Sequence, residues 1–315
     1  TTVSEHSVTV TALHFEKTRI WFAETDIKDV LDSDNVGRRL AEFLPTEDLV
    51  HSFVLSEGLA VNGSALVRSI NENLPNTVAV TGGLAGDGDQ FKSTAVGCNT
   101  VPKSNRVALI GFYGTSLKVG YGSQGGWKVS GNPDEKYTIT RSVGNVLYEL
   151  NGEPALDVYK RLLGPELAAK LPSSGLLFPL QLELPQEGVV VRTILGIDEN
   201  NKSMTFAGDM PQGDTAHLMH ATEDDLIQSA GVAGADAATM LGGTPPQFAA
   251  LVSCVGRRLV LKDRSHEEIE KVKEYVGHTA AIHGFYSYGE LCPHQGSSRT
   301  LMHNQTMTVT AFAEI

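Results

Sequence analysis

Cysteine is scarce in this 315-residue chain, and basic residues are outnumbered by acidic ones. An odd set of three cysteines, Cys98, Cys254 and Cys292, makes a poor disulfide framework and fits a reducing compartment. Together 25 lysines and arginines and 37 aspartates and glutamates give a formal net charge of −12. Proteins that bind nucleic acid or an anionic membrane surface need a basic face instead. The composition therefore argues against both kinds of partner.

The chain also lacks a long hydrophobic run. A membrane-spanning helix needs about 18 or more apolar residues, and the best candidate, EGVVVRTILGID at 187–198, is interrupted by Arg192. The opening residues, TTVSEHSVTV, show no basic region followed by an apolar core, so we expect no secretory signal. We therefore predict a cytoplasmic protein without membrane insertion.

Length and patterning predict two domains of the α/β class. A chain of this length suggests two domains. Pro154 suits the first turn of a helix, and we place the boundary just before that helix, which gives domains 1–148 and 149–315. Strands that are connected through a helix are expected to pair in parallel, and strands that are connected by a hairpin at the end of each half are expected to pair antiparallel. We expect two related halves with mixed β-sheets flanked by helices.

The two halves are expected to share an order of elements, strand-helix-strand-strand. In the first half these segments are 48–58, 62–75, 76–89 and 106–114. In the second half they are 246–261, 265–277, 279–291 and 299–315.

Finer predictions accompany this order. We expect 7–15 to form a strand, and the segments RVALIGFYG and SLKVGYGSQ to pair through a short loop. GVVVRTILGID and SMTFAGDM should form another strand pair. Thr222 should cap one helix, and Ser265 with Glu268 should form the capping box of another.

A glycine-rich turn, GGLAGDGD at 82–89, follows one of these strands. A phosphate cradle would need backbone N–H groups and a nearby cation. Asp87 and Asp89 would instead repel phosphate. A tight turn that needs positive φ is the better interpretation, and a pocket wall is the functional alternative.

Several side chains could carry chemistry, each with a plainer alternative. Cys254 is either an inert buried thiol or a nucleophile whose pKa Arg257 and Arg258 could lower. The same arginines could bind a carboxylate. Cys292, followed by Pro293 and His294, is either an ordinary turn or a thiolate haem-binding motif.

Other candidates lie on predicted strands. His283 is a strand histidine, and His303 with Asn304 could pin the last strand to its neighbour. Tyr286, Tyr288 and Glu290 alternate, so we expect them to share one face, either as a polar ladder or as the wall of a pocket.

Metal and enzyme chemistry find little support in the sequence. His217 and His220 are three residues apart without an evident third ligand, so we predict no metal site. We find no Ser-His-Asp order and no metal-type cysteine pair. A binding protein is therefore favoured over an enzyme.

Five stretches together resemble the FIST family: GGLAGDG, TRSVGNVLYELNGEPALDVYKRLLG, SCVGRRLVL, GFYSYGEL and LMHNQTMTVT. The resemblance covers nearly the whole chain. It implies a FIST N-terminal and a FIST C-terminal domain in an intracellular sensory protein that is not an enzyme. The implied partner is a histidine kinase or another signalling protein, and the implied ligand is a small molecule such as an amino acid. One branch of the family binds haem and responds to nitric oxide.

The resemblance also assigns candidate residues. The expected ligand-binding residues are Gly83, Asp87, Cys254, Arg257, Tyr286, Tyr288, Glu290 and Asn304. For haem the candidates are His283 and His303, with Cys292 as a thiolate alternative. We expect the glycine-rich turn and the C-terminal tyrosine segment to enclose the cavity between them. A haem-free metabolite receptor and, behind it, a cysteine enzyme using Cys254 or Cys292 are the alternatives.

Overall fold

A computed structural model describes residues 2–4, 7–131, 134–184, 188–294, 297 and 299–315. In this part of the chain, the two halves share one nine-stranded sheet in the order β1-β4-β2-β3-β16-β15-β18-β5, with β17 beside β16. The first half contributes β1 (Arg19–Asp26), β2 (Leu49–Ser56), β3 (Ala79–Ala85), β4 (Arg106–Tyr113) and β5 (Leu117–Gln124). The second half contributes β15 (Phe248–Cys254), β16 (Ala281–Pro293), β17 (Thr300–His303) and β18 (Met307–Glu314).

The order of strands is mirrored about the antiparallel contact between β3 and β16. On one side β3 is parallel to β2, which is antiparallel to β4. On the other side β16 is parallel to β15, which is antiparallel to β18. The prediction of two related α/β halves with mixed pairing is therefore confirmed.

The predicted pairing of the segments at 106–114 and 116–124 is wrong. Both segments form strands, β4 and β5, but β4 lies between β1 and β2, and β5 pairs with β18. Because both edges of β4 are already occupied, its successor along the chain crosses to the other half. The first half of the chain thereby contributes the edge strand, β5, to the second half's side of the sheet.

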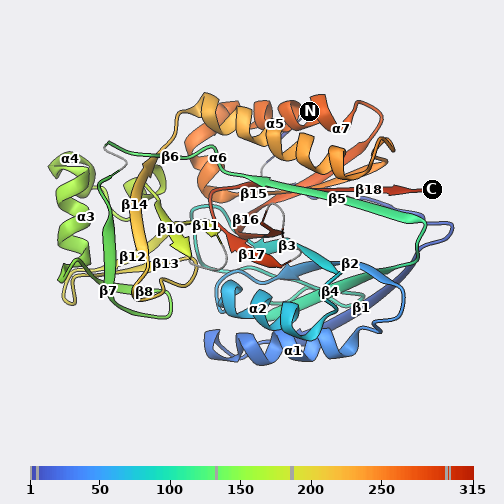
Figure 1. Ribbon diagram of the computed structural model, residues 1–315, viewed down its shortest axis with the longest axis horizontal. Coiled ribbons are helices and arrows are strands. Elements are labelled where there is room, and N and C mark those ends of the chain that lie inside the picture. The colour runs from blue at the N-terminus through green and yellow to red at the C-terminus, as the bar shows by residue number, and fades with distance from the viewer. Residues whose placement is uncertain (1, 5–6, 132–133, 185–187, 295–296, 298) are drawn as a thin grey trace.

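The sheet is folded so that its two halves face each other. Phe112 of β4 and Phe312 of β18 lie 5.2 Å apart between ring centroids although their strands are not neighbours. Thr310 donates a hydrogen bond to Thr81 across the same interface at 2.8 Å. The helices α1 (Ser33–Phe43) and α2 (Gly63–Asn73) cover one outer face, and α5 (Glu223–Met240) and α7 (Ser265–Val276) cover the other, giving four layers (Figure 1).

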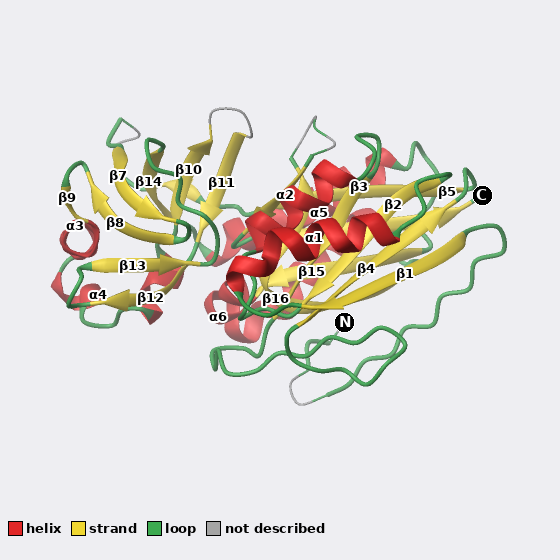
Figure 2. Ribbon diagram, turned by 90° about the horizontal axis from the view of Figure 1, so that it is seen from below, coloured by secondary structure: helices red, strands yellow, loops and turns green. Residues whose placement is uncertain are grey.

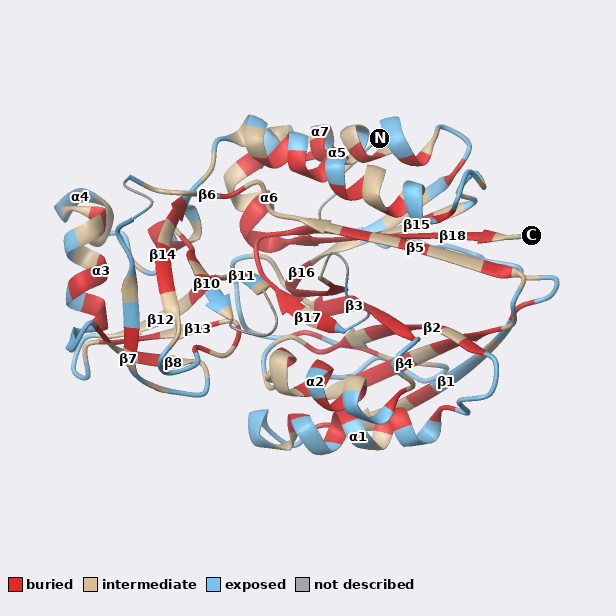
Figure 3. Ribbon diagram, viewed as in Figure 1, coloured by how far each residue is buried: buried red, intermediate tan, exposed pale blue. Residues whose placement is uncertain are grey.

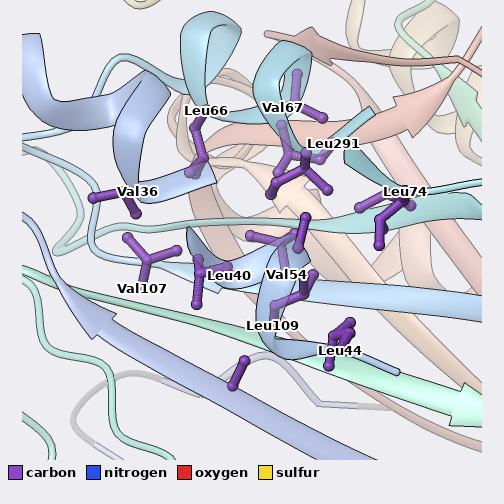
Figure 4. Packing of buried hydrophobic residues seen from close by; sticks show 14 of the residues in the cluster. Val36, Leu40, Leu44, Val54, Leu66, Val67, Leu74, Val107, Leu109 and Leu291 are labelled. Atoms are coloured by element: carbon purple, nitrogen blue, oxygen red, sulfur yellow. The ribbon is translucent and has the colours of Figure 1, made fainter. Parts of the chain in front are cut away.

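Apolar side chains at helical spacing attach each helix pair to its half of the sheet. Figure 4 shows Leu40 of α1 and Leu66 of α2 packed against Val54 and Leu109 of the strands below. The central strands β2, β3, β15 and β18 and the inward faces of these helices are largely buried, whereas the edge strand β1 is mostly not (Figure 3).

The helix ends confirm one predicted cap and correct the other. Thr222 accepts a hydrogen bond from the Asp225 backbone N–H and forms a capping box with Asp225, because α5 begins at the next residue. For α7 the predicted box is wrong. The Ser265 hydroxyl donates to the Lys262 carbonyl at 2.6 Å, and Glu268 points into the protein.

The part of the chain between β5 and α5 forms a second sheet, which lies beside the main sheet (Figure 2). Its described strands follow the order β11-β10-β14-β7-β8-β13-β12, with β6 beside β14 and β9 beside β8. These strands are β6 (Lys128–Val129), β7 (Tyr137–Val143), β8 (Val146–Leu150), β9 (Glu153–Pro154), β10 (Leu180–Leu184), β11 (Gly188–Arg192), β12 (Ile194–Asp198), β13 (Ser203–Phe206) and β14 (Thr215–His220). The segment predicted as one strand at 188–198 is divided into β11 and β12, and only β12 pairs with β13 as predicted, whereas β11 pairs with β10. Short helices α3 (Ala155–Leu163) and α4 (Pro165–Ala168) pack at the side of this sheet.

Two further points concern boundaries. The segment predicted as one strand at 246–261 is instead β15 followed by the helix α6 (Val255–Leu261). The predicted domain boundary at 148/149 falls within β8, and as a domain division it stays a prediction.

None of the helices in the described ranges combines the length and apolar character needed to cross a membrane.

Candidate functional site

The glycine-rich segment and the C-terminal tyrosine segment lie side by side, as neighbouring strands. Glu290 of β16 pairs with Gly83 of β3, and Leu291 pairs with Gly82. Paired strands are separated by about 4.8 Å, so the cavity expected between these segments is not there. A Cβ atom at Gly83 would lie 2.5 Å from Val252 Cγ1. The glycine therefore serves the close packing of β3 against β15 and β16.

A β-bulge separates the three side chains that were expected to share a face. The register of β16 against β3 shifts between Ser287 and Gly289. Tyr286 donates to Glu268 Oε1 at 3.2 Å, whereas Tyr288 donates to Asp87 and stacks on Phe91 with 4.5 Å between ring centroids. The two tyrosines thus bind different elements, and Asp87 is held by a side chain of the opposite half.

Arg257 forms the centre of a buried polar cluster. Its side chain is completely buried and pairs with Glu268, which is equally buried, at 3.0 Å from Nε and 2.9 Å from Nη2 to Oε2. It also donates to the carbonyls of Gly125 at 2.8 Å and Leu226 at 2.7 Å. Ser253 donates to the second Glu268 oxygen at 3.0 Å. These contacts join β15, α5, α6, α7 and the residue that follows β5.

Glu290 is fully buried beside this cluster, and burial raises the pKa of its carboxyl group to about 8. Its Oε2 accepts from the backbone N–H and the hydroxyl of Thr306 at 3.2 and 3.0 Å. Its Oε1 lies 2.5 Å from Ser287 Oγ, which is also 3.1 Å from the Ser253 carbonyl. The single Ser287 proton can serve only one of these oxygens. If Glu290 is protonated, its carboxyl group donates a hydrogen bond to Ser287 Oγ, and the Ser287 hydroxyl donates to the Ser253 carbonyl. Every polar group in this series of hydrogen bonds then has a partner.

The three residues predicted for haem do not converge. His283 and Cys292 are nine residues apart on β16, about 30 Å along an extended strand. Burial raises the pKa of the Cys292 and Cys254 thiols, so neither is a thiolate at neutral pH. His303 Nε2 bonds the Cys292 carbonyl at 3.0 Å, and burial lowers the His303 pKa to about 4. Of the three, His303 alone lines one of the two clefts described below.

Two clefts separate the main sheet from the second sheet. Cleft 1, of about 670 Å³, lies between α2, the residues that lead into β17, and the second sheet. Its polar lining includes Ser64, Arg68, Asn71, Arg192, Asp209, Asp214 and Arg299. Cleft 2, of about 800 Å³, lies between β5, α5 and the second sheet, and its lining includes Trp127, Val191, Met219 and His303.

Arg192 is the residue of cleft 1 that spans both parts of the molecule. It lies at the end of β11 and is 3% exposed. Its Nε donates to the Asp209 carbonyl and its Nη1 to the Met302 carbonyl of β17, each at 3.0 Å. The sequence marked this position only as the charge that interrupts an apolar run.

The predicted site residues have mixed outcomes. His303 lines cleft 2, whereas the remaining predicted residues are absent from the described linings of both clefts. Asn304 is buried and donates to the Tyr288 carbonyl at 3.2 Å. The predicted ligand-binding roles stay predictions, while the observed contacts of these residues hold the two halves together.

A duplicated α/β core with a second sheet set against it, and two clefts between them, defines a protein with space for a small ligand between its parts. The chain belongs to the FIST family: a FIST N domain matches residues 1–153 and a FIST C domain matches residues 155–293. FIST domains are sensory ligand-binding domains of signalling proteins.

Other comparisons add little. No curated protein matches the chain. The crystal structure of cyanuric acid hydrolase from A. caulinodans aligns over 94% of this chain and 99% of that one, with 12% identity and a TM-score of 0.21. A TM-score this low supports no inference about fold or activity.

Proposed function

We propose that this protein is the ligand-binding input of a cytoplasmic signalling pathway and that it binds without catalysing a reaction. The ligand is a small zwitterionic metabolite such as an amino acid, held in cleft 1. The observation that carries this proposal is Arg192, a buried arginine on the cleft wall that contacts both the second sheet and β17. The partner that receives the signal is a histidine kinase or another signalling protein.

The charges around cleft 1 suit a zwitterion. Arg68 and Arg299 provide cationic groups that can pair with a carboxylate, and Asp209 and Asp214 provide acceptors for an ammonium group. Because the lining comes from both parts of the molecule, a bound ligand contacts both at once. It shifts their relative arrangement if it binds one arrangement more tightly than another.

Amino acids are therefore expected to raise the melting temperature of the purified protein. A ligand at one hundred times its Kd adds about 2.7 kcal/mol to stability, which amounts to several degrees. Arg68→Gln should weaken binding about tenfold or more. The matched control is Arg38→Gln, because Arg38 is an exposed arginine of α1 that pairs with Glu42. A panel of twenty amino acids without any shift, or equal affinities for the two variants, would refute the assignment of cleft 1.

Haem in cleft 2 is the second candidate, and it is favoured by His303, a neutral imidazole in a lining that also includes the apolar side chains of Trp127 and Met219. When bound, haem iron would supply the binding of nitric oxide. Added hemin should give a Soret band that differs from that of free hemin and moves with nitric oxide. His303→Ala should abolish this spectrum, whereas His220→Ala, at an exposed position, should not. A spectrum identical to free hemin would remove this candidate.

A further inference from the structure

Residues 7–15, here called the leading segment, are built to form a strand but pair with none. Their sequence, SVTVTALHF, contains no Asp, Glu, Lys or Arg and alternates valine with threonine, a composition typical of strands. In the described part of the chain the segment has no strand partner. Val8 is 90% exposed and Val10 is 81% exposed. The strand predicted here is therefore absent from the single chain.

The far end of this segment is fixed to the body of the protein. The Glu314 carboxylate accepts hydrogen bonds from the backbone N–H groups of Glu16, Lys17 and Thr18 at 2.7, 3.0 and 2.7 Å. Phe15 packs edge-to-face on Phe112 with ring centroids 6.1 Å apart. The leading segment is thus anchored directly beside the start of β1.

β1 is an edge strand whose first half is uncovered. It pairs with β4 on one side only. In its second half Glu24 accepts a hydrogen bond from the Cys98 backbone N–H of a loop at 3.1 Å, and it also pairs with Arg106 of β4 at 2.6 Å. In the first half Trp21 is 53% exposed and Phe22 is also exposed. Edge strands with exposed apolar side chains are templates for pairing with another chain.

We propose that the leading segment of one copy adds as a strand to the uncovered half of β1 in a second copy, and that the exchange is reciprocal. Both the strand-forming segment and the edge that lacks a partner belong to this chain, and they begin at the same corner. A two-fold axis at this corner satisfies both copies with one closed interface. Backbone hydrogen bonds would supply affinity, and Val8 and Val10, which share one face of the added strand, would pack beside Phe22.

The charge distribution favours a second copy at this place. Two chains that each carry a net charge of −12 repel one another over most of their surfaces. The leading segment has no Asp, Glu, Lys or Arg, and the one charged residue of the uncovered stretch Arg19–Ala23, Arg19, is paired with Asp48 at 3.5 Å. This corner can therefore approach a second copy without the general repulsion.

The test is the mass of the full chain by size-exclusion chromatography with light scattering. The wild-type protein is expected at twice its chain mass of 33.7 kDa. Val8→Asp/Val10→Asp should weaken the dimer about tenfold or more, because it would bury two charges beside Phe22. Thr9→Asp/Thr11→Asp adds the same charges on the opposite face of the strand and should leave the dimer intact.

Cross-linking then tests which residues meet. In a Cys98→Ser background, oxidation of a mixture of Val10→Cys and Phe22→Cys chains should give the mixed disulfide dimer. Val10→Cys mixed with Val232→Cys, an exposed position on α5, should give none. A monomeric wild type, a dimer that Val8→Asp/Val10→Asp leaves unchanged, or equal cross-linking in the two mixtures would overturn the proposal.

Discussion

Arg257→Met is expected to lower the free energy of unfolding by about 3–5 kcal/mol, because it leaves the Glu268 carboxylate buried without its cation. Methionine fills much of the space of the arginine side chain, so the loss reports the ion pair and the donors to Gly125 and Leu226 rather than an empty volume. Urea unfolding followed by circular dichroism measures the change.

Arg264→Met is the matched control. Arg264 also pairs with several carboxylates, Glu223, Asp224 and Glu267, but all of these groups are partly exposed. Exposed pairs contribute about 1 kcal/mol or less, so this variant should cost far less than Arg257→Met.

The double variant Arg257→Met/Glu268→Gln should regain part of the loss. A glutamine at position 268 removes the stranded charge and keeps an oxygen that can accept from Ser253 and Tyr286. Equal losses for Arg257→Met and Arg264→Met would contradict a structural role for the buried pair, and would favour the ligand-binding role predicted for Arg257.

Local patterns were sufficient to predict the segments but not their partners. α2, with Leu66 and Ile70 at helical spacing, and α5, capped by Thr222, follow from periodicity and capping signals within a few residues. The pairing of β5 with β18 could not be found this way, because it depends on which edges remain free once the sheet has formed. The turn from β15 into α6 was missed for a related reason: an apolar run does not distinguish a buried strand from a buried helix.

The site was harder to predict than the fold, because the motifs and the clefts are different sets of residues. Gly83 and Glu290 are close together as the sequence led us to expect, yet they serve the contact between the two halves. Cleft 1 is lined by Arg68, Arg192 and Arg299, which are far apart in the sequence and come together only when the second sheet packs against α2. Their one local signal was a charge within an apolar strand, at Arg192.

The stability of the wild-type protein is expected to fall by a few kcal/mol between pH 5 and pH 8 because of Glu290. The carboxyl group has a pKa of about 8 in the folded chain and about 4.3 when unfolded. Between these values the folded chain retains the proton and the unfolded chain has released it. Folding therefore takes up a proton, and the Glu290 contribution falls by up to about 1.4 kcal/mol per pH unit. That contribution is fully present below about pH 4 and lost above pH 8.

Glu290→Gln should flatten this dependence. The glutamine amide can donate to Ser287 and accept from Thr306, which reproduces the protonated acid without a group that titrates. The variant should therefore equal or exceed the wild type in stability at pH 8. At pH 5 it should be slightly less stable than the wild type, because the second amide hydrogen of glutamine has no acceptor where the protonated acid has an oxygen. Glu72→Gln, at an exposed position of α2, should leave the pH profile unchanged. Unfolding free energies measured from pH 5 to pH 9 would contradict a protonated Glu290 if the wild type and Glu290→Gln ran parallel over the whole range, because only a titrating buried acid makes the two curves converge or cross.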